Sequence, residues 1–401
     1  MVAEWIRDQR GVYTGKPIYA FLNIYGVFIF RLVKGELKLP NWKLKIYGVV
    51  FIMGYIALFV CTLDLPTAVT NTSDIVDIIN DIPGMVLLIQ FVTSAITASF
   101  LVNATNVRIM HAFAELDTIL RVETVTNFYK KSHTQTVIML IILLVTHAIN
   151  SIADIIFADD DELNVTAMIE LPLHFYQKLQ VLAFIKTILM LKSRLTLINN
   201  YLSIFIDSQE RKTITIFTIR DTKVATEDKF NFIGNASERN FKIRELALMY
   251  DLIGNIGAMI NEVFNFQIFM TLVSTFIFIV TIIWTSLFYY KTPDSDDKGP
   301  LFNIAIWCFS SIYTVAIMSF ICERLLLVRN ETKILVNKII MNYDLPKIMR
   351  VQAKAFMELI EAWPLRIYIY DMFSVDITLM LKFISVATTY LIVIIQISHF
   401  I

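Results

Sequence analysis

The sequence predicts an all-α membrane protein with seven transmembrane helices, a cytosolic N-terminus and an extracellular C-terminus. Hydrophobic residues make up 56% of the 401 residues and charged residues only 17%, whereas soluble domains carry about 25% charged residues. The mean hydropathy is +0.63. Apolar runs long enough to cross a bilayer follow one another along the chain, and the polar segments between them alternate between basic and acidic.

The apolar runs define the elements in order, because a helix needs about 20 such residues to cross a bilayer. A shorter run over 17–30 is interpreted as an interfacial or packed N-terminal helix. The fourth segment is the most polar, with Gln177, Lys178, Gln180 and Lys186. The predicted segments are 46–66, 83–105, 136–158, 171–192, 263–290, 301–328 and 376–398.

The orientation follows from the charges between these segments. Lys and Arg are frequent before segment one, between segments two and three, between four and five, and after six. The segments after one, three and five are rich in Asp instead. Because short basic loops stay in the cytosol, the N-terminus is expected inside and the C-terminus outside.

Two inner regions are predicted to form a cytosolic helical anchor. Helices are expected to extend inward from segments four and five, joined by a polar loop near 209–238. The stretch 347–363 is amphipathic and is expected to end at Trp363, because a proline follows. Its predicted apolar face consists of Met349, Ala353, Phe356 and Ile360. The predicted organisation is 1–45 cytosolic, 46–192 transmembrane helices one to four, 193–262 cytosolic extensions and loop, 263–328 helices five and six, 329–375 anchor helix and turn, and 376–401 terminal transmembrane helix.

Several function classes are disfavoured by what the sequence lacks. It contains no HExxH, GxSxG, P-loop or GxGxxG motif, and its five histidines show no metal-ligand spacing. We therefore expect no enzyme activity, no cofactor and no metal. The net charge of +0 does not suggest a nucleic-acid partner.

Two other classes of membrane protein remain as alternatives. A seven-helix chain suggests a G-protein-coupled receptor, although the predicted orientation is opposite and the NPxxY pattern is absent. A transporter is expected to show repeats and helices interrupted by glycine or proline, and this chain has only 11 Gly and 9 Pro.

The terminal segment carries the most specific pattern. It ends with Thr389-Tyr390, five aliphatic residues and Gln396. This ending resembles the terminal-helix signature of insect gustatory receptors, in which Thr-Tyr is followed by five apolar residues and Gln-Phe. The stretch 373–379 also resembles the residues that lead into that helix. The chain departs from the pattern at Ile397, where the family has Phe.

The resemblance implies a tastant-gated, non-selective cation channel in the plasma membrane of sensory neurons. It implies a homotetramer, or a heteromer with related receptors, around a central pore lined by the terminal helices. Its expected partners are therefore related subunits, membrane lipid, permeating cations and a small-molecule tastant. The ending is more similar to receptors for bitter or plant-derived compounds; a fructose-type sugar receptor and an odorant-receptor channel are the alternatives.

Residues of the terminal segment are candidates for the pore and gate. Thr389, Val393 and Gln396 fall at i, i+4 and i+7 and share one helix face, and Ile397 follows. A polar residue within the membrane should face protein or water. A hydrogen bond inside one subunit would also satisfy Gln396, whereas the resemblance implies that copies of it line a pore.

The outer halves of the other segments contain candidate ligand-binding residues. Binding sites in helix bundles are apolar with a few polar groups. Aromatic residues near helix ends can instead belong to an interfacial belt, and polar ones can join helices. The candidates are His147, Asn150, His174, Gln177, Trp284, Trp307 and Ser311.

The acidic outer loops carry two candidate glycosylation sites, at Asn71 and Asn164, both in Asn-X-Ser/Thr sequons. The carboxylates of these loops would raise the local cation concentration if several subunits surround a pore. Ordinary solvated loops would have the same composition.

Overall fold

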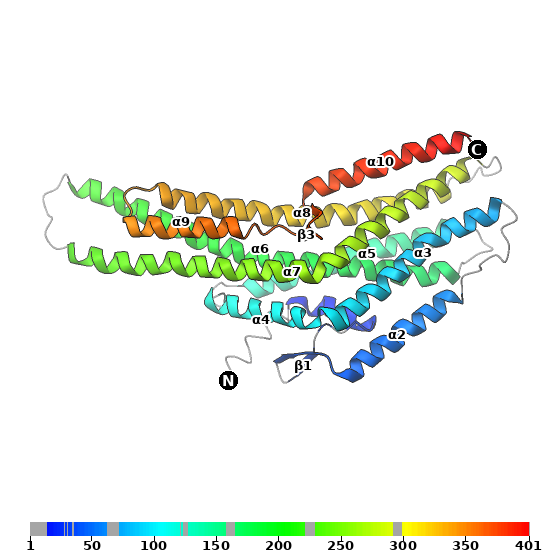
Figure 1. The fold of residues 1–401 in the computed structure, drawn as a ribbon, viewed down its shortest axis with the longest axis horizontal. Helices are drawn as coiled ribbons and strands as arrows, with labels where there is room; N and C mark the ends of the chain where they lie inside the picture. Colours follow the sequence, from blue (N-terminus) through cyan, green and yellow to red (C-terminus); the bar gives the residue numbers. More distant parts are fainter. Residues whose placement is uncertain are drawn as a thin grey trace.

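The structure, a computed structural model, is an elongated bundle of long helices (Figure 1). It describes the backbone of residues 14–27, 29, 31–33, 36–61, 72–120, 122, 127–157, 165–220, 229–291 and 299–400. Residues 14–24 form a short helix. It is followed by β1 (Arg31–Val33) and β2 (Glu36–Lys38), which pair antiparallel. The remaining elements are α2 (Trp42–Val60), α3 (Thr72–Ile96), a π-helical turn (Thr97–Leu101), α4 (Asn103–Ile119), α5 (Phe128–Phe157), α6 (Val165–Arg220), α7 (Lys229–Lys291), α8 (Gly299–Met341), α9 (Lys347–Ala362), β3 (Tyr368–Ile369), β4 (Phe373–Ser374) and α10 (Ile377–Phe400).

The seven predicted segments overlap α2, α3, α5, α6, α7, α8 and α10. The second also continues through the π-helical turn into α4, and residues 62–66 of the first and 158 of the third lie outside the described residues. Among the described residues, five helices are long and apolar enough to cross a bilayer. These are Trp42–Val60, Asp81–Leu101, Phe128–Ile156, Ile243–Thr285 and Ala305–Met341. Within α10, Ile377–Tyr390 forms a shorter apolar helix. Of the helices that contain a predicted segment, α6 is the one whose described residues include no apolar stretch of either kind.

The polar character of α6 follows from its central position. It packs against α3, α5, α7 and α8, and its polar side chains point into the bundle. Gln177 donates to Ser274 Oγ at 2.7 Å, and Lys186 donates to Ser132 Oγ at 2.7 Å. Because protein neighbours replace lipid around α6, these polar residues find partners, and the helix needs no continuous apolar surface.

In the half of the bundle that contains α9, this helix packs against α7 and α8; that this half is a cytosolic anchor stays a prediction. The predicted apolar face of α9 is confirmed, because Met349, Ala353, Phe356 and Ile360 are its buried residues. The helix ends before Trp363, as predicted. The predicted polar loop over 209–238 is too long, since α6 is helical to Arg220 and α7 begins at Lys229.

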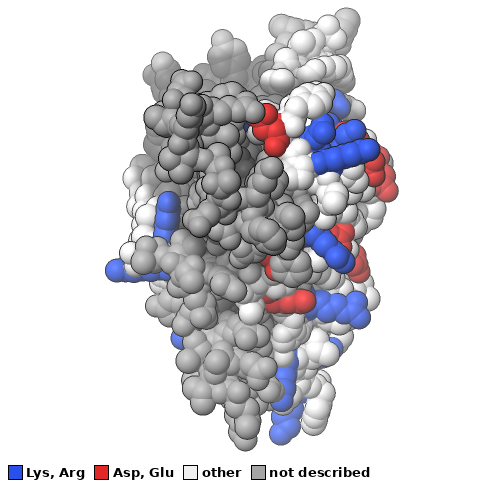
Figure 2. Space-filling view, turned by 90° about the vertical axis from the view of Figure 1, so that its left-hand side faces the viewer, with Lys and Arg blue, Asp and Glu red and all other residues white. Residues whose placement is uncertain are grey.

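The basic residues of the predicted inner segments lie at one end of the bundle, whereas most of the acidic residues predicted for the other end are outside the described residues. The end of α2, the start of α3 and the ends of α7 and α10 lie together at the right of Figure 1. At the opposite end, which contains α9, Figure 2 shows Lys and Arg side chains over the described surface, with Asp and Glu among them. Lys338, Lys347 and Lys354 are exposed there. Which end faces the cytosol stays a prediction.

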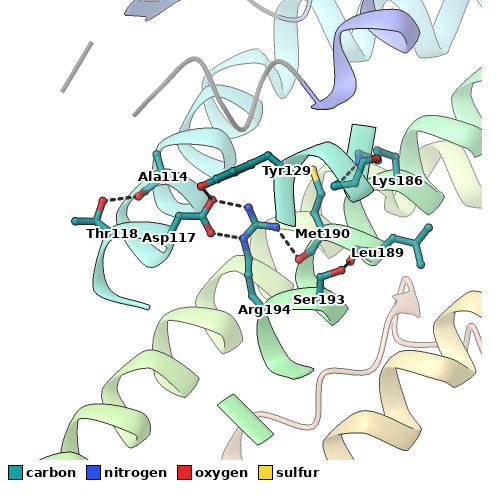
Figure 3. A network of polar contacts seen from close by, with 10 residues as sticks. Ala114, Asp117, Thr118, Tyr129, Lys186, Leu189, Met190, Ser193 and Arg194 are labelled. Atoms are coloured by element: carbon teal, nitrogen blue, oxygen red, sulfur yellow. Dashed lines mark hydrogen bonds and ion pairs between the residues drawn. The ribbon is translucent and has the colours of Figure 1, made fainter. Parts of the chain in front are cut away.

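A buried ion pair joins α4 to α6 (Figure 3). Arg194 Nε donates to Asp117 Oδ1 at 2.7 Å and its Nη2 to Asp117 Oδ2 at 2.6 Å. Tyr129, at the start of α5, donates to Asp117 Oδ2 at 2.9 Å. The Arg194 guanidinium also lies over the Phe113 ring, 4.7 Å from its centroid. Two planar N–H groups facing one carboxylate fix the relative position of these helices.

The connection from α9 to α10 is held by α7. Asn261 and Asn265 are one turn apart on α7 and accept hydrogen bonds from the backbone N–H groups of Tyr368 and Tyr370, each at 2.9 Å. The hairpin of β3 and β4 is therefore tied to α7 just before the terminal helix begins. A displacement of α7 would be transmitted to the start of α10 through these bonds.

Candidate functional site

A cavity of about 670 Å³ lies between α5, α6 and α8. Its volume is within the range of small-molecule sites. Exposed side chains such as Ile142, Ile149 and Phe309 border it, so it opens on the side of the bundle. The cavity is lined by Met139, Ile142, Leu143, Thr146, Ile149, Asn150, Lys178, Val181, Leu182, Ile185, Ala305, Ile306, Phe309, Ser310, Tyr313, Thr314 and Ile317.

The polar groups of this cavity are concentrated at one point, around Lys178. Its ammonium donates to Ser310 Oγ at 2.8 Å. An ammonium can only donate, so the Asn150 amide fits best with its oxygen accepting from Lys178 Nζ at 3.1 Å and from Ser310 Oγ at 3.2 Å. The hydroxyls of Thr146 and Thr314 donate to carbonyls of their own helices. Apart from the hydroxyl of Tyr313, the remaining lining is apolar, so the charged and amide groups are gathered at one end of the cavity.

An aromatic cluster lies behind this polar end. The Trp307 ring lies 4.6 Å from the His174 ring and 5.8 Å from the Phe278 ring, measured between centroids. Lys178 Nζ is 5.1 Å from the Trp307 ring centroid. Trp307 Nε1 donates to Asp154 Oδ1 at 2.8 Å. The cluster therefore positions Lys178 and forms its wall, rather than facing the cavity itself.

The predicted binding residues occupy different surroundings. Asn150 lines the cavity, and His174 and Trp307 lie next to it in the aromatic cluster. The His147 ring packs on Phe175 at 5.0 Å. Gln177 points to the other side of α6, into a network with Gln90 and Ser274. The two other predicted residues, Trp284 and Ser311, do not line the cavity.

Three polar residues of this region, Lys178, Ser310 and Asp154, were missed by the sequence-based selection. Ser310, one position before the predicted Ser311, is the serine that faces the cavity. Asp154 accepts from both Trp307 and Asn303, the latter at 2.9 Å. Ionisable residues inside transmembrane segments are functional candidates by default. Applied to Lys178 and Asp154, which both lie in predicted segments, this rule would have identified the polar end of the cavity.

The terminal helix α10 contacts the rest of the subunit along one face. Phe276 of α7 packs against Phe383 and Tyr390, with ring centroids 6.4 and 5.3 Å apart. Away from this face the helix is open: Leu381 is 63% exposed and Ile392 is 52% exposed. A large apolar surface of this helix is thus left uncovered by the part of the chain that the structure describes.

The predicted pore residues lie on the open side of α10. Thr389, Val393 and Gln396 are all exposed. The Thr389 hydroxyl donates to the Ser385 carbonyl at 2.9 Å. Gln396 makes no hydrogen bond with any other described residue, so the alternative of a bond inside the subunit has no partner in this part of the chain. The side chain of Ile397 and the predicted glycosylation sites Asn71 and Asn164 lie outside the described residues.

Within the described ranges, no group of three His, Cys, Asp or Glu side chains could hold a metal ion.

Comparison with known proteins gives a consistent result. A family model described as 7tm chemosensory receptor matches residues 15–399. The fold is similar to the olfactory receptor OR5 of the insect Machilis hrabei in complex with eugenol, with a TM-score of 0.54 and 12% identity over 98% of this chain and all of that one. A second structure of the same receptor is similar with a TM-score of 0.55 and 12% identity, over 95% of this chain and 97% of that one. No curated protein sequence matches.

Proposed function

The chain belongs to the 7tm chemosensory receptor family, and we propose from this that it is a gustatory receptor acting as a tastant-gated, non-selective cation channel. The observation that carries the proposal is the terminal helix, on which Gln396 and a large apolar surface have no partner among the described residues of the subunit. A glutamine exposed to lipid is costly. Packing of the same helix from other subunits around an axis removes that cost and creates a conduit.

In this proposal four copies of α10 surround the pore. Thr389, Val393 and Gln396 face it, and Ile397 forms an apolar ring that closes it by dewetting. The subunits are identical or belong to related receptors. The acidic outer segments raise the concentration of cations at the entrance.

The cavity between α5, α6 and α8 is the proposed tastant site. Its single polar end and apolar walls suit a compact organic molecule such as a bitter or plant-derived compound. A sugar, which carries hydroxyls over its whole surface, would leave most of them unpaired against these walls. The predicted residues Trp307 and His174 then act by holding Lys178 in place.

Gating requires that the tastant bind the open state more tightly than the closed one. Moving the channel from about 1% to about 99% open needs about 5.5 kcal/mol of differential affinity. Divided among four sites, this is about 1.4 kcal/mol each, which one good contact supplies. The route from the cavity to α10 runs through α8 and α7, which both contact the terminal helix.

The test is electrical recording from excised patches of cells that express this chain. We expect bitter or plant-derived compounds to evoke cation currents in the absence of nucleotides and G protein. A current that depends on GTP would instead support a G-protein-coupled mechanism. Silence of this chain alone, with currents when a related receptor is added, would identify the heteromeric form.

An olfactory function is the second candidate, because the similar solved structures are of an olfactory receptor. Volatile and non-volatile agonists distinguish the two functions. A receptor that responds to volatile odorants at lower concentrations than to any tastant in the panel would be olfactory.

A further inference from the structure

We propose that the cavity between α5, α6 and α8 recognises an amphipathic carboxylate, an organic acid whose carboxylate pairs with Lys178. This inference rests on the proposed function and adds the chemical class of the ligand. It starts from an electrostatic imbalance at the polar end of the cavity, where a buried cation is held only by neutral groups.

Lys178 is only 8% exposed. Its contacts are the Ser310 hydroxyl, the Asn150 amide and the Trp307 ring, all of which are neutral. The salt bridges among the described residues join Arg194 to Asp117 and Lys333 to Glu361, so none involves Lys178. The Asp154 carboxylate is near enough to attract Lys178 electrostatically but forms no salt bridge with it. A buried ammonium whose direct contacts are all neutral is incompletely compensated, and such a site gains most from a ligand that brings an anion into contact.

The acidic residue of this region is already engaged elsewhere. Asp154 Oδ1 accepts hydrogen bonds from Trp307 and from Asn303, at 2.8 and 2.9 Å. These bonds direct the carboxylate to the indole and the amide. An ammonium has three N–H groups, and two are used by Ser310 and Asn150, so the third is available to a ligand oxygen.

The rest of the cavity determines which hydrophobic group the ligand can carry, here called the ligand's body. Beyond Lys178 the walls are formed by aliphatic side chains and by Phe309 and Tyr313, whose rings lie stacked 6.5 Å apart. An aryl or alkyl group would pack there without unpaired polar atoms. Phe309 is 73% exposed and Tyr313 43%, so the body enters through the side of the bundle that these rings border.

The experiment compares 4-phenylbutanoate with its methyl ester on purified full-length protein in lipid nanodiscs. Dissociation constants are measured by protection against thermal unfolding, for the wild type and for Lys178→Met. The ratio of the ester constant to the acid constant is the decisive quantity. Partitioning into lipid affects each probe equally in both proteins and cancels when the ratios are compared.

We expect this ratio to be about 30-fold or more smaller in Lys178→Met than in the wild type. Lys178→Arg keeps the charge and should retain the acid preference within about threefold. Lys186→Met is the matched control: Lys186 lies on the same helix and is equally buried, but it binds Ser132 outside the cavity. Its ratio should equal that of the wild type. Equal ratios in wild type and Lys178→Met, or no protection by either probe, would overturn the proposal.

A wild-type measurement covers the case in which Lys178→Met does not fold. A photoreactive diazirine derivative of 4-phenylbutanoate should label cavity residues such as Tyr313, and excess acid should prevent the labelling. Labelling elsewhere, or labelling that the acid does not reduce, contradicts the assignment. Carboxylate binding without any evoked current would reject the channel function while keeping this site. Currents evoked equally by acid and ester would keep the channel function and reject the carboxylate site.

Discussion

Gly254 of α7 lies so close to the side chain of Trp363 that no larger residue fits. A Cβ added at this position would be 2.3 Å from Trp363 Cγ. The indole cannot move away freely, because its Nε1 donates to Asp251 Oδ1 at 2.8 Å and its backbone carbonyl accepts from the Tyr250 hydroxyl at 2.9 Å. The glycine therefore allows the turn after α9 to dock on α7.

Gly254→Ala is expected to destabilise the protein by about 1–3 kcal/mol through overpacking. Gly54→Ala in α2 is the matched control, since its added Cβ would meet nothing within 4 Å and alanine favours the helix by about 0.5–1 kcal/mol. Thermal unfolding followed by fluorescence-detected size-exclusion chromatography measures both. Equal melting temperatures for the two variants would show that the turn adapts and that this packing is not needed.

The ion pair between Arg194 and Asp117 gives the second prediction at this scale. Both side chains are almost fully buried, with 2% and 6% exposed. Asp117→Asn removes the negative charge and leaves a buried cation, at an expected cost of about 3–5 kcal/mol. The same thermal measurement should detect it as a large loss of folded receptor. The double variant Asp117→Leu, Arg194→Met removes both charges and should recover part of the loss; a double variant less stable than Asp117→Asn would show that the pair is itself strongly stabilising.

At the scale of the element, α10 combines a fixed start with an open surface. Asp376 caps its first turn, accepting from the Thr378 backbone N–H at 2.9 Å. The hairpin before it is tied to Asn261 and Asn265 of α7. Farther along, contact with the subunit is limited to one face. The helix is thus anchored where it begins and is free to change its packing toward its end.

The terminal helix is therefore where substitutions should change conduction rather than folding. Ile397→Ser should raise the current in the absence of ligand, because a polar ring holds water in a constriction that an apolar ring would dry. Gln396→Ala should change ion selectivity or conductance more than the half-maximal ligand concentration. Both are measured by patch recording at matched surface expression. Normal basal current, selectivity and conductance in both variants would place the gate elsewhere.

At the scale of the whole molecule, orientation in the membrane is the property to test first. Basic side chains are exposed at the end that contains α9, and the short basic segments predict that this end is cytosolic. An epitope tag at the N-terminus should bind antibody only after permeabilisation. A tag after Ile401 should bind on intact cells. The reverse accessibility would favour the orientation of G-protein-coupled receptors and remove the basis of the pore proposal.

Periodicity and composition were sufficient to predict the helices other than α4 (Asn103–Ile119), which lies where only a basic connecting segment was expected. The apolar segments of α2, α3, α5, α7, α8 and α10 stand out because lipid requires a continuous apolar surface. The face of α9 followed from the same kind of pattern, because it packs on neighbouring helices and presents its other side to water. The terminal motif was sufficient to identify the family.

Only the tertiary structure decided which polar residues share a site. Lys178 made the fourth segment look doubtful in the sequence, yet it is the centre of the cavity's polar end, where α5 and α8 bring Asn150 and Ser310 to it. Gln177, one residue away, faces a different network with Gln90 and Ser274. A local pattern records whether a side chain is polar, but its partners lie on other helices, as Gln90 does for Gln177 and Ser310 for Lys178. The packing of the helices determines which partner it meets.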